Sequence, residues 1–331
     1  MSWYQEKGQL DEYIFSTRVR LARNISGINF PSSMNRDQSV KVADMVLDAI
    51  KPIISDYDIY DLEKTDEATV GMLIEKHLIS PAFKPSNLKR IALISKDMSV
   101  SLMINEEDHI RIQCFSAGLD SEKTLDTAGK IDALLRERLK FAYHEKYGYL
   151  TSCPTNCGTA MRISAMMHLP SLSLSGAVPQ LLRECANEGM TVRGFYGEGS
   201  DAPGNIFQIS NQITLGVNAK DILDKFSQIM DMIISAEGNL REKMKKSLSS
   251  QLKDKILRAN GIINSAYMLS TSEYLNLQSL VRLGHYLGLL ETDLLKLKKL
   301  WIETSPCHLM ENNAEKRDIK RAETVKKLLK E

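Results

Sequence analysis

The stretch Cys153-Pro154-Thr155-Asn156-Cys157-Gly158-Thr159-Ala160-Met161-Arg162 opens with a thiol, closes with a guanidinium and leads into an apolar run, residues 163–169. Small residues let backbone amides approach a ligand closely, and the apolar run is typical of a buried strand. The stretch therefore predicts a strand whose entry loop presents polar and reactive side chains. Taken alone, it also fits a cysteine buried in a turn and an arginine on the surface.

The composition is that of a globular chain with little charge bias. Its 331 residues allow two domains, and a hydrophobic content of 43% is ample for a packed core. The net charge of +1 predicts neither a nucleic-acid binder nor a membrane-surface protein. The first residues carry no basic segment followed by an apolar core, and no run of about 18 apolar residues occurs. We therefore expect a cytoplasmic protein without nucleic-acid or membrane partners.

Five cysteines are scattered along the chain, at positions 114, 153, 157, 185 and 307. An odd, scattered set fits free thiols in a reducing compartment better than a disulfide framework. Cys153 and Cys157 have no second Cys/His pair at zinc-site spacing, so we expect no metal site built from protein side chains.

Two arginines alternate with an apolar residue in Arg18-Val19-Arg20. In a strand this alternation places both guanidinium groups on one face, where they repel each other unless an anion joins them. A solvated edge strand is the simpler interpretation of an isolated Arg-x-Arg. Further along, His77 fits a core histidine better than a ligand contact.

Two short aliphatic runs, residues 91–94 and 100–104, predict a β-hairpin, and alternation from Ile110 predicts a third strand. Between the second and third strands lies Asn105-Glu106-Glu107-Asp108-His109. Its three acids fit a solvated turn, or a carboxylate site for a cation with Arg111 as a neighbouring anion site. A long helix with Ser121 as its N-cap is predicted for residues 121–143.

A glycine-rich segment, residues 194–204, separates predicted strands at 190–193 and 206–211. It contains neither a Walker P-loop nor a dinucleotide-binding fingerprint, and it suits a mobile lid. From Ala219 onward, helical periodicity replaces strand signals. We therefore predict a catalytic domain over residues 1–240 and a small all-helical domain over residues 241–331, joined by a long helix near residues 240–250.

Arginines at strand ends and loop bases suit a polyphosphate, because each guanidinium can bind phosphate oxygens with two hydrogen bonds. Phosphoryl transfer requires such a positive site, Mg²⁺ on the phosphates and an acceptor held in line. Carboxylates beside a thiol would suit a cationic acceptor. The residues that carry this pattern are Arg18, Arg20, Arg111, Arg162, Arg193, Glu107, Glu198 and Cys153.

Four ordered motifs, at residues 16–20, 105–111, 153–162 and 193–211, resemble those of the phosphagen (guanidino) kinases, and most closely their bacterial protein-arginine kinase branch. The resemblance implies an α+β fold, with an antiparallel sheet flanked by helices in a guanido kinase/glutamine synthetase-like catalytic domain. It also implies a small all-helical C-terminal domain, and ATP and Mg²⁺ as cofactors.

The same resemblance implies roles for individual residues. Glu107 and Glu198 would clamp the acceptor guanidinium, with Cys153 beside the reacting nitrogen, and His77 would lie near the nucleotide. The remaining ATP contacts implied by the resemblance are Ser16, Thr17, Arg18, Val19, Arg20, Arg111, Arg162, Ile163, Ser164, Ala165, Met166, Arg193, Gly194, Phe195, Tyr196, Gly197 and Glu198.

Two features favour arginine in proteins over a small metabolite as the acceptor. The first motif begins at residue 16, whereas metabolite kinases of the family carry a helical domain ahead of it. The C-terminal part contains Arg317-Asp318-Ile319-Lys320-Arg321-Ala322, which on pattern alone predicts a salt-bridged surface helix. It matches the allosteric phosphoarginine-binding motif of the protein-arginine kinases.

Partners also follow from the resemblance alone. They are protein substrates with exposed arginines, a second copy in a homodimer, a zinc-containing activator, a stress-gene repressor and a Clp protease that degrades the marked substrates.

Three positions depart from the family pattern: Ala160, Cys157 and Gln208. Ala160 replaces a glycine, which matters only if the backbone there has a positive φ. None of the three removes a charged participant, so we expect an active enzyme. The alternatives are a kinase for free arginine or another small guanidino compound, and a catalytically inactive phosphoarginine-binding adaptor.

Overall fold

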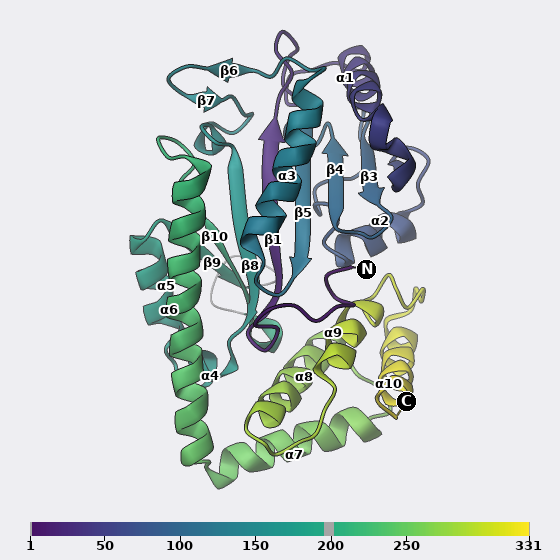
Figure 1. Cartoon of the computed structure of the whole chain (residues 1–331). Coiled ribbons are helices and arrows are strands. Elements are labelled where there is room, and N and C mark those ends of the chain that lie inside the picture. Colours follow the sequence, from purple (N-terminus) through teal and green to yellow (C-terminus); the bar gives the residue numbers. More distant parts are fainter. Residues whose placement is uncertain (1, 195–201, 331) are drawn as a thin grey trace.

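A computed structural model of the chain describes residues 2–194 and 202–330, and within them an eight-stranded antiparallel sheet forms the centre (Figure 1). In spatial order the strands are β2 (Tyr57–Asp61), β3 (Ile91–Ser95), β4 (Val100–Ile104), β5 (Ile110–Ala117), β1 (Ile14–Arg23), β8 (Met161–His168), β10 (Ile206–Asn211) and β9 (Met190–Gly194). A separate small hairpin pairs β6 (Tyr143–His144) with β7 (Gly148–Tyr149). The predicted antiparallel sheet and its β3–β4 hairpin are confirmed.

Helices follow and flank the strands. The first six are α1 (Arg36–Ala49), α2 (Glu67–Glu75), α3 (Ser121–Arg136), α4 (Pro170–Leu174), α5 (Val178–Asn187) and α6 (Ala219–Lys246). The C-terminal four are α7 (Ser250–Ser265), α8 (Thr271–Tyr286), α9 (Leu294–Glu303) and α10 (Ala314–Lys330). Short 3₁₀ turns lie at Lys51–Asp56, Pro154–Asn156 and Pro203–Asn205. None of the described helices combines the length and apolar character needed to cross a bilayer.

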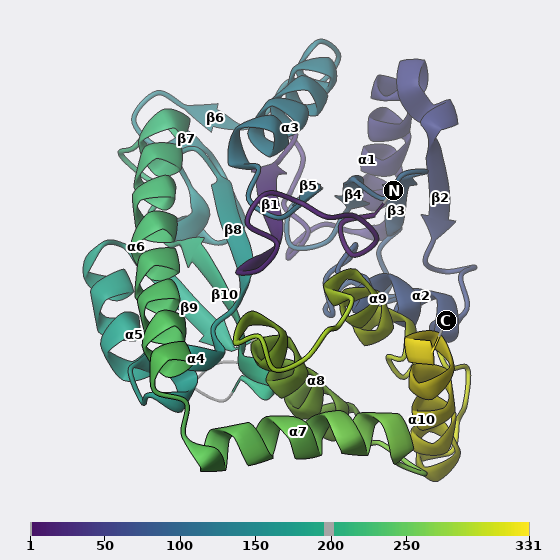
Figure 2. The same ribbon diagram turned by 60° about the horizontal axis from the view of Figure 1, so that its bottom comes forward.

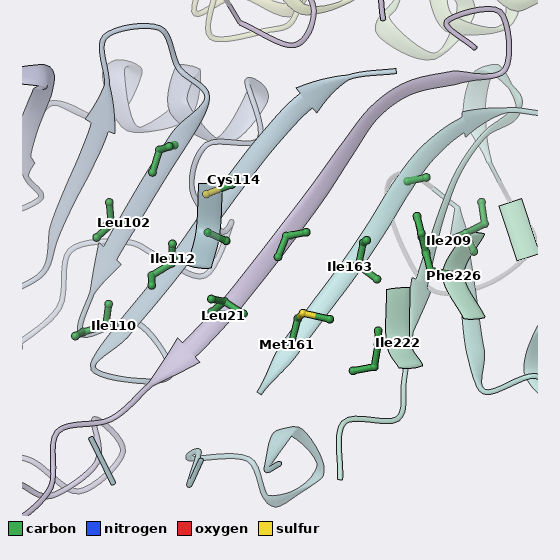
Figure 3. Close-up of a cluster of buried hydrophobic side chains, with 14 of the residues drawn as sticks. Leu21, Leu102, Ile110, Ile112, Cys114, Met161, Ile163, Ile209, Ile222 and Phe226 are labelled. Carbon is green, nitrogen blue, oxygen red and sulfur yellow. The ribbon is translucent and has the colours of Figure 1, made fainter. Parts of the chain in front are cut away.

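One face of the sheet is apolar and carries the main core. Leu21, Ile112, Ile163 and Ile209 line up across four neighbouring strands on this face, and Phe226 of α6 packs over them (Figure 3). Side chains alternate between the two faces along a strand, so the residues between these positions must lie on the opposite face. That opposite face carries the polar residues of the candidate site.

The C-terminal helices pack against one end of the sheet (Figures 1 and 2). Arg282 of α8 is fully buried with its guanidinium 4.5 Å from the centre of the Phe15 ring. Lys298 of α9 forms an ion pair of 2.6 Å with Asp11. These charged groups are hydrogen-bonded or stacked where they are buried, as a stable interface requires. The helical region is therefore tied to the strand that carries the arginine pair.

Two predicted helices differ from the structure. α3 ends at Arg136 rather than near residue 143, because Phe141 forms a β-bridge with Ile25 and draws the chain out of the helix. Its N-cap position is held by Asp120 rather than Ser121. The predicted helix near residues 240–250 is interrupted after Lys246, where Ser249 caps a new helix by accepting from the Leu252 amide. The division at residue 240 stays a prediction.

Candidate active site

The register of β1 gathers arginines on one face of the sheet. Arg20 lies opposite Gln113 of β5 on one side and Arg162 of β8 on the other. Directly opposed residues in antiparallel strands share a face, so Arg18, Arg20 and Arg162 point to the same side. The alternation that predicted two guanidinium groups on one face is therefore confirmed by the register.

Few acceptors compensate these charges. Arg162 donates through Nε and Nη2 to the Ser210 hydroxyl at 3.1 and 2.8 Å, and Arg18 donates to Oε1 of Gln208 at 3.3 Å. Within residues 2–194 and 202–330, no carboxylate forms an ion pair with Arg18, Arg20 or Arg162. The guanidinium groups of Arg18 and Arg162 therefore donate their hydrogen bonds to neutral side chains.

Crowding and burial lower the pKa values of these arginines. Burial, and then the charges of Arg162 and Arg111, lower the pKa of Arg18 to about 10. Burial, and then the charges of Arg18, Arg111 and Arg162, hold the pKa of Arg20 well below its usual range. Arginine remains protonated at neutral pH, so the charged cluster lowers the stability of the ligand-free fold. A bound polyanion would relieve this repulsion.

A cavity of about 700 Å³ lies over the arginine face. This volume is within the usual range for a small-molecule site. The sheet and its edges contribute Arg18, Arg20, Gln113, Arg162, Arg193, Gly194 and Gln208, whereas other segments contribute Ile74, Glu75, His77, Ile79, Ser80, Pro81, Thr271, Trp301, Ser305 and Pro306. Six residues of the predicted nucleotide set therefore share one cavity with residues that are distant in sequence.

The acidic turn before β5 presents one partly exposed carboxylate. Asn105 opens the turn with φ 62°, a left-handed conformation that asparagine tolerates better than most residues. Arg111 pairs with the buried Glu106 at 2.5 Å and with Glu107 at 2.7 Å. The Glu107 side chain is 43% exposed, so its carboxylate is accessible from solvent.

The loop that carries Cys153 is hydrogen-bonded to this turn. The Ser152 hydroxyl donates to the Glu107 carbonyl at 2.6 Å, and the Ser152 amide donates to the Asp108 carboxylate at 2.8 Å. The Sγ of Cys153 lies 3.0 Å from the Thr155 hydroxyl. Two segments some 45 positions apart in the chain are thereby joined, and the predicted thiol and carboxylate come from neighbouring loops.

The backbone at the end of the cysteine loop requires a glycine at position 158. Its φ is 105°, and a Cβ added there would overlap the carbonyl of Thr214. Thr214 also donates its hydroxyl to the carbonyl of Cys157 at 2.7 Å, so the backbone cannot shift freely. Ala160 follows with φ 48°, which costs a residue with a Cβ about 1 kcal/mol. The departure from the glycine that the resemblance implies therefore falls at a position of positive φ.

Gly158→Ala is expected to lower the free energy of unfolding by about 2 kcal/mol, because it adds a backbone collision to the strain of a positive φ. The matched control is Gly176→Ala, where φ is 71° and no atom lies within 4 Å of an added Cβ. Chemical denaturation of both variants measures the difference. Equal losses would show that the loop accommodates the extra atom.

His77 lies at the edge of the cavity, between the rings of Trp3 at 5.8 Å and Trp301 at 6.2 Å. Burial, and then the charge of Arg18, lower its pKa to about 3. The folded protein therefore holds a neutral imidazole, while the unfolded chain gains a proton as the pH falls through about 6.5. Its contribution to stability is present above that pH and is lost progressively between pH 6.5 and about 3.

His77→Asn is expected to remove part of this acid sensitivity while keeping a residue that tolerates the positive φ of 62°. The loss of unfolding free energy between pH 6.5 and about 5 should be smaller by about 1 kcal/mol than in the unmodified protein. Urea denaturation at several pH values measures this difference. His144→Asn, at an exposed histidine, is the control and should leave the slope unchanged.

The other predicted nucleotide residues divide between the two faces. Ser16 and Ser164 share the face of the arginines, and Met166 lies on that face opposite Gln208. Thr17 instead donates its hydroxyl to the Gly118 carbonyl at 2.7 Å. The remaining members, Val19, Ile163 and Ala165, have side chains buried in the main core, so only their backbone faces the site.

The predicted phosphoarginine motif lies on α10, away from the sheet. Arg321 is 1% exposed, pairs with Asp318 at 2.5 Å, and donates to the carbonyls of Thr304 and Leu269 at 2.9 and 2.7 Å. Lys320 donates to the Leu309 carbonyl at 2.6 Å. Ala322 is fully buried, Ile319 is partly buried, and Arg317 donates to the Glu311 carbonyl at 3.4 Å.

Several predicted residues lie outside the described part of the chain. They are Phe195, Tyr196, Gly197 and Glu198, within the segment interpreted as a lid. Sequence reasoning missed Gln113 and Ser210, and it did not predict that Glu106, one of the three acids of the turn, would pair with Arg111. Gln113 lies two positions after Arg111 in β5, and Ser210 lies two positions after Gln208 in β10. The alternation that identified the arginines could therefore have found both residues.

Comparison with known proteins identifies the family. Residues 39–240 match the family described as ATP:guanido phosphotransferase, C-terminal catalytic domain, and residues 249–331 match the protein-arginine kinase McsB C-terminal domain. A protein-arginine kinase of Caldanaerobacter subterraneus subsp. tengcongensis is 44% identical over 323 residues, which cover 95% of this chain and 96% of the relative. This chain belongs to the protein-arginine kinase family. A relative from Clostridium kluyveri is 41% identical, covering 96% of this chain and 94% of its own length.

Solved structures show the same fold for this chain. A duplicated taurocyamine kinase from Schistosoma mansoni matches 80% of this chain and 38% of its own, with a TM-score of 0.65 and 24% identity. A lombricine kinase matches 69% of this chain and 68% of its own, with a TM-score of 0.59 and 22% identity. The guanidino kinase fold expected from the motifs is confirmed.

Proposed function

We propose that this protein transfers the γ-phosphoryl group of ATP to the guanidinium of arginine residues in proteins. The observation that carries the proposal is the arginine face of the sheet with its cavity. Arg111 lies on the same face, opposite Ala22, and pairs with the accessible carboxylate of Glu107, to which the loop of Cys153 is hydrogen-bonded. Membership of the protein-arginine kinase family supports the choice of acceptor.

The arginines would hold the phosphates. Arg18, Arg20 and Arg162 share one face with few compensating groups, and Arg193 lines the same cavity. Guanidinium groups bind phosphate oxygens with paired hydrogen bonds and stabilise the charge that develops during transfer. Most of the catalytic effect in this reaction comes from such positioning and electrostatics.

In the proposed step, a lone pair on a guanidinium nitrogen of the acceptor attacks the γ-phosphorus. An N–P bond forms as the bond from that phosphorus to the β,γ-bridging oxygen breaks, and ADP leaves with the electron pair. The guanidinium proton passes to a carboxylate, for which Glu107 and Glu198 are the candidates. Cys153 would lie beside the reacting nitrogen and help to hold the cationic acceptor.

Arg111 would couple the two halves of the site. It pairs with Glu107 at 2.7 Å as well as with Glu106 at 2.5 Å. Phosphates that attract Arg111 would release the Glu107 carboxylate, which could then bind the acceptor guanidinium. Nucleotide binding would thereby prepare the acceptor position.

Mg²⁺ would enter with the nucleotide. Among the described side chains, no group of three or more His, Cys, Asp or Glu residues forms a metal site. Mg²⁺ is commonly held by substrate phosphates and water with few protein ligands, so this donor set fits an ion carried by ATP. When bound, the ion neutralises charge on the phosphates.

The remaining proposals rest on the family resemblance. We place Arg317 to Ala322 in an allosteric phosphoarginine pocket within a helical region, residues 241–331, that also mediates homodimerisation. The proposed partners are a zinc-containing activator, a stress-gene repressor as substrate, and a Clp protease that degrades marked proteins in the cytoplasm during stress.

A competition between acceptors tests the proposed substrate. Release of ADP from Mg·ATP is followed with an unfolded arginine-rich protein, with the same protein after replacement of its arginines by lysine, and with free L-arginine. We expect turnover with the first acceptor alone. Turnover with free L-arginine alone would assign the chain to the metabolite kinases, and nucleotide binding without turnover would favour the adaptor.

A further inference from the structure

The cavity over the sheet has two chemically different ends. Arginines line the end formed by the strands, whereas Ile74, Ile79, Trp301 and Pro306 make the other end apolar. A nucleotide has the same division between its triphosphate and its aromatic base. The cavity therefore presents matching surfaces to both parts of one ligand.

Part of the apolar end comes from the C-terminal helical region. Thr271, Trp301, Ser305 and Pro306 line the cavity, and all four lie beyond residues 39–240, the segment that matches the guanido phosphotransferase family. We call these four residues the C-terminal wall. The phosphate end of the cavity and this wall thus belong to separate parts of the chain.

The segment that follows the C-terminal wall is hydrogen-bonded to α2. Glu75, at the end of α2, accepts from the amides of Cys307 and His308 at 2.7 and 3.2 Å and lies 2.7 Å from Nδ1 of His308. Gly71, one turn earlier, has no side chain, and a Cβ there would overlap the Sγ of Cys307. Close packing and a shared carboxylate therefore hold the segment after Pro306 against α2.

One guanidinium, that of Arg321, is hydrogen-bonded to both segments that carry the C-terminal wall. Arg321 donates to the carbonyl of Thr304, next to Ser305, and to the carbonyl of Leu269, two residues before Thr271. Because Arg321 is buried and paired with Asp318, its guanidinium is held in one orientation. One side chain thus sets the spacing between the two segments that form the wall.

We propose that the C-terminal wall binds the purine base of the nucleotide, with Pro306 in contact with the base, the nearly buried Trp301 (2% exposed) close to it, and Glu75 and Arg321 as positioning residues. The inference rests on the proposed function and deepens it. Aromatic and proline side chains pack well on the apolar faces of a purine. The helical region would then contribute directly to nucleotide affinity.

Tryptophan fluorescence tests whether the base lies close to Trp301, since the chain contains two tryptophans, Trp3 and Trp301. Trp301 lines this cavity, whereas Trp3 packs behind it, 6.0 Å from Trp301 between ring centres. The Trp3→Phe variant should retain emission that Mg·ATP quenches and that Mg·tripolyphosphate, which has no base, does not. The matched Trp301→Phe variant should lose this difference. If the difference in quenching between Mg·ATP and Mg·tripolyphosphate is lost in Trp3→Phe and kept in Trp301→Phe, the proposal is wrong.

Calorimetry of the two ligands provides a second measurement that also reports folding. Pro306→Gln should weaken ATP about fivefold and leave tripolyphosphate within about twofold, because only the base contact changes. Met310→Gln, at a 71% exposed side chain outside the cavity, is the control and should change neither affinity. Equal weakening of both ligands by Pro306→Gln would contradict a base contact.

The two proposals fail in different ways. If the unmodified protein binds tripolyphosphate as tightly as ATP, the C-terminal wall does not bind the base, while the phosphate site stands. If it binds neither ligand, the proposed function and the wall are both wrong.

Discussion

Glu107→Gln is expected to reduce phosphoryl transfer by roughly 10²–10⁴-fold while nucleotide affinity stays the same or increases. The amide has the shape of the carboxylate, but it takes up no proton at neutral pH and lacks the negative charge that holds a guanidinium. Glu107 also forms an ion pair of 2.7 Å with Arg111. Its removal leaves Arg111 available for phosphates, which is why affinity for ATP should not fall. Single-turnover kinetics and calorimetry measure the two quantities separately.

Glu145→Gln is the matched control for this prediction. It removes the same charge from an exposed position in the neighbouring β6–β7 hairpin and should leave transfer unchanged. A Glu107→Gln variant that loses ATP binding would show that Glu107 serves the nucleotide rather than the acceptor. A variant that retains full transfer would remove Glu107 from the mechanism.

Arg20→Gln is expected to have opposite effects on binding and stability. Loss of one charge-assisted phosphate contact should weaken ATP by roughly 10–10²-fold. Arg20 is also crowded by Arg18, Arg111 and Arg162, and burial together with these charges holds its pKa well below the usual range. Removing the charge relieves this repulsion, so the ligand-free protein should melt at a higher temperature.

Arg36→Gln is the control for an arginine outside the cluster. Arg36 is exposed and pairs with Glu63 at 2.6 Å, so its removal should change neither ATP affinity nor the melting temperature noticeably. Thermal melts with and without Mg·ATP give both quantities for each variant. An Arg20→Gln protein that is less stable without ligand would mean that the cluster is not under electrostatic strain.

Local patterns predicted much of the sheet and its polar face. Alternation in Arg18-Val19-Arg20 determined which side chains share a face, because the period of a strand is two. Local signals also predicted the hairpin of β3 and β4, and strand β9, which a glycine precedes and another ends. The family resemblance, rather than these patterns, supplied the roles of Glu107 and Cys153.

Contacts between distant segments could not be predicted in the same way. Nothing in the sequence near Glu75 indicates that its carboxylate accepts from the amides of Cys307 and His308, more than 230 residues away. The end of α3 was missed for a similar reason, because the β-bridge between Phe141 and Ile25 overrides the local helical pattern. Such features depend on tertiary packing, which local periodicity does not encode.

The α10 motif shows how one residue can fit two interpretations. On pattern alone, residues 317–322 predicted a salt-bridged surface helix, but Arg321 is 1% exposed and supports two loops of the helical region. Arg317 and Lys320 bond to neighbouring carbonyls in the same region. The phosphoarginine pocket implied by the resemblance stays a prediction, and Arg321 has a structural role beside it.

The central claim is tested most directly by locating the transferred phosphate. The purified protein is incubated with Mg·ATP and an unfolded arginine-rich protein, and the product is analysed by mass spectrometry at neutral pH, before and after brief acid treatment. We predict an added phosphate on arginine side chains that disappears in acid, as expected for an N–P bond. An acid-stable phosphate on serine, threonine or tyrosine, or phosphate on free arginine alone, would contradict the account.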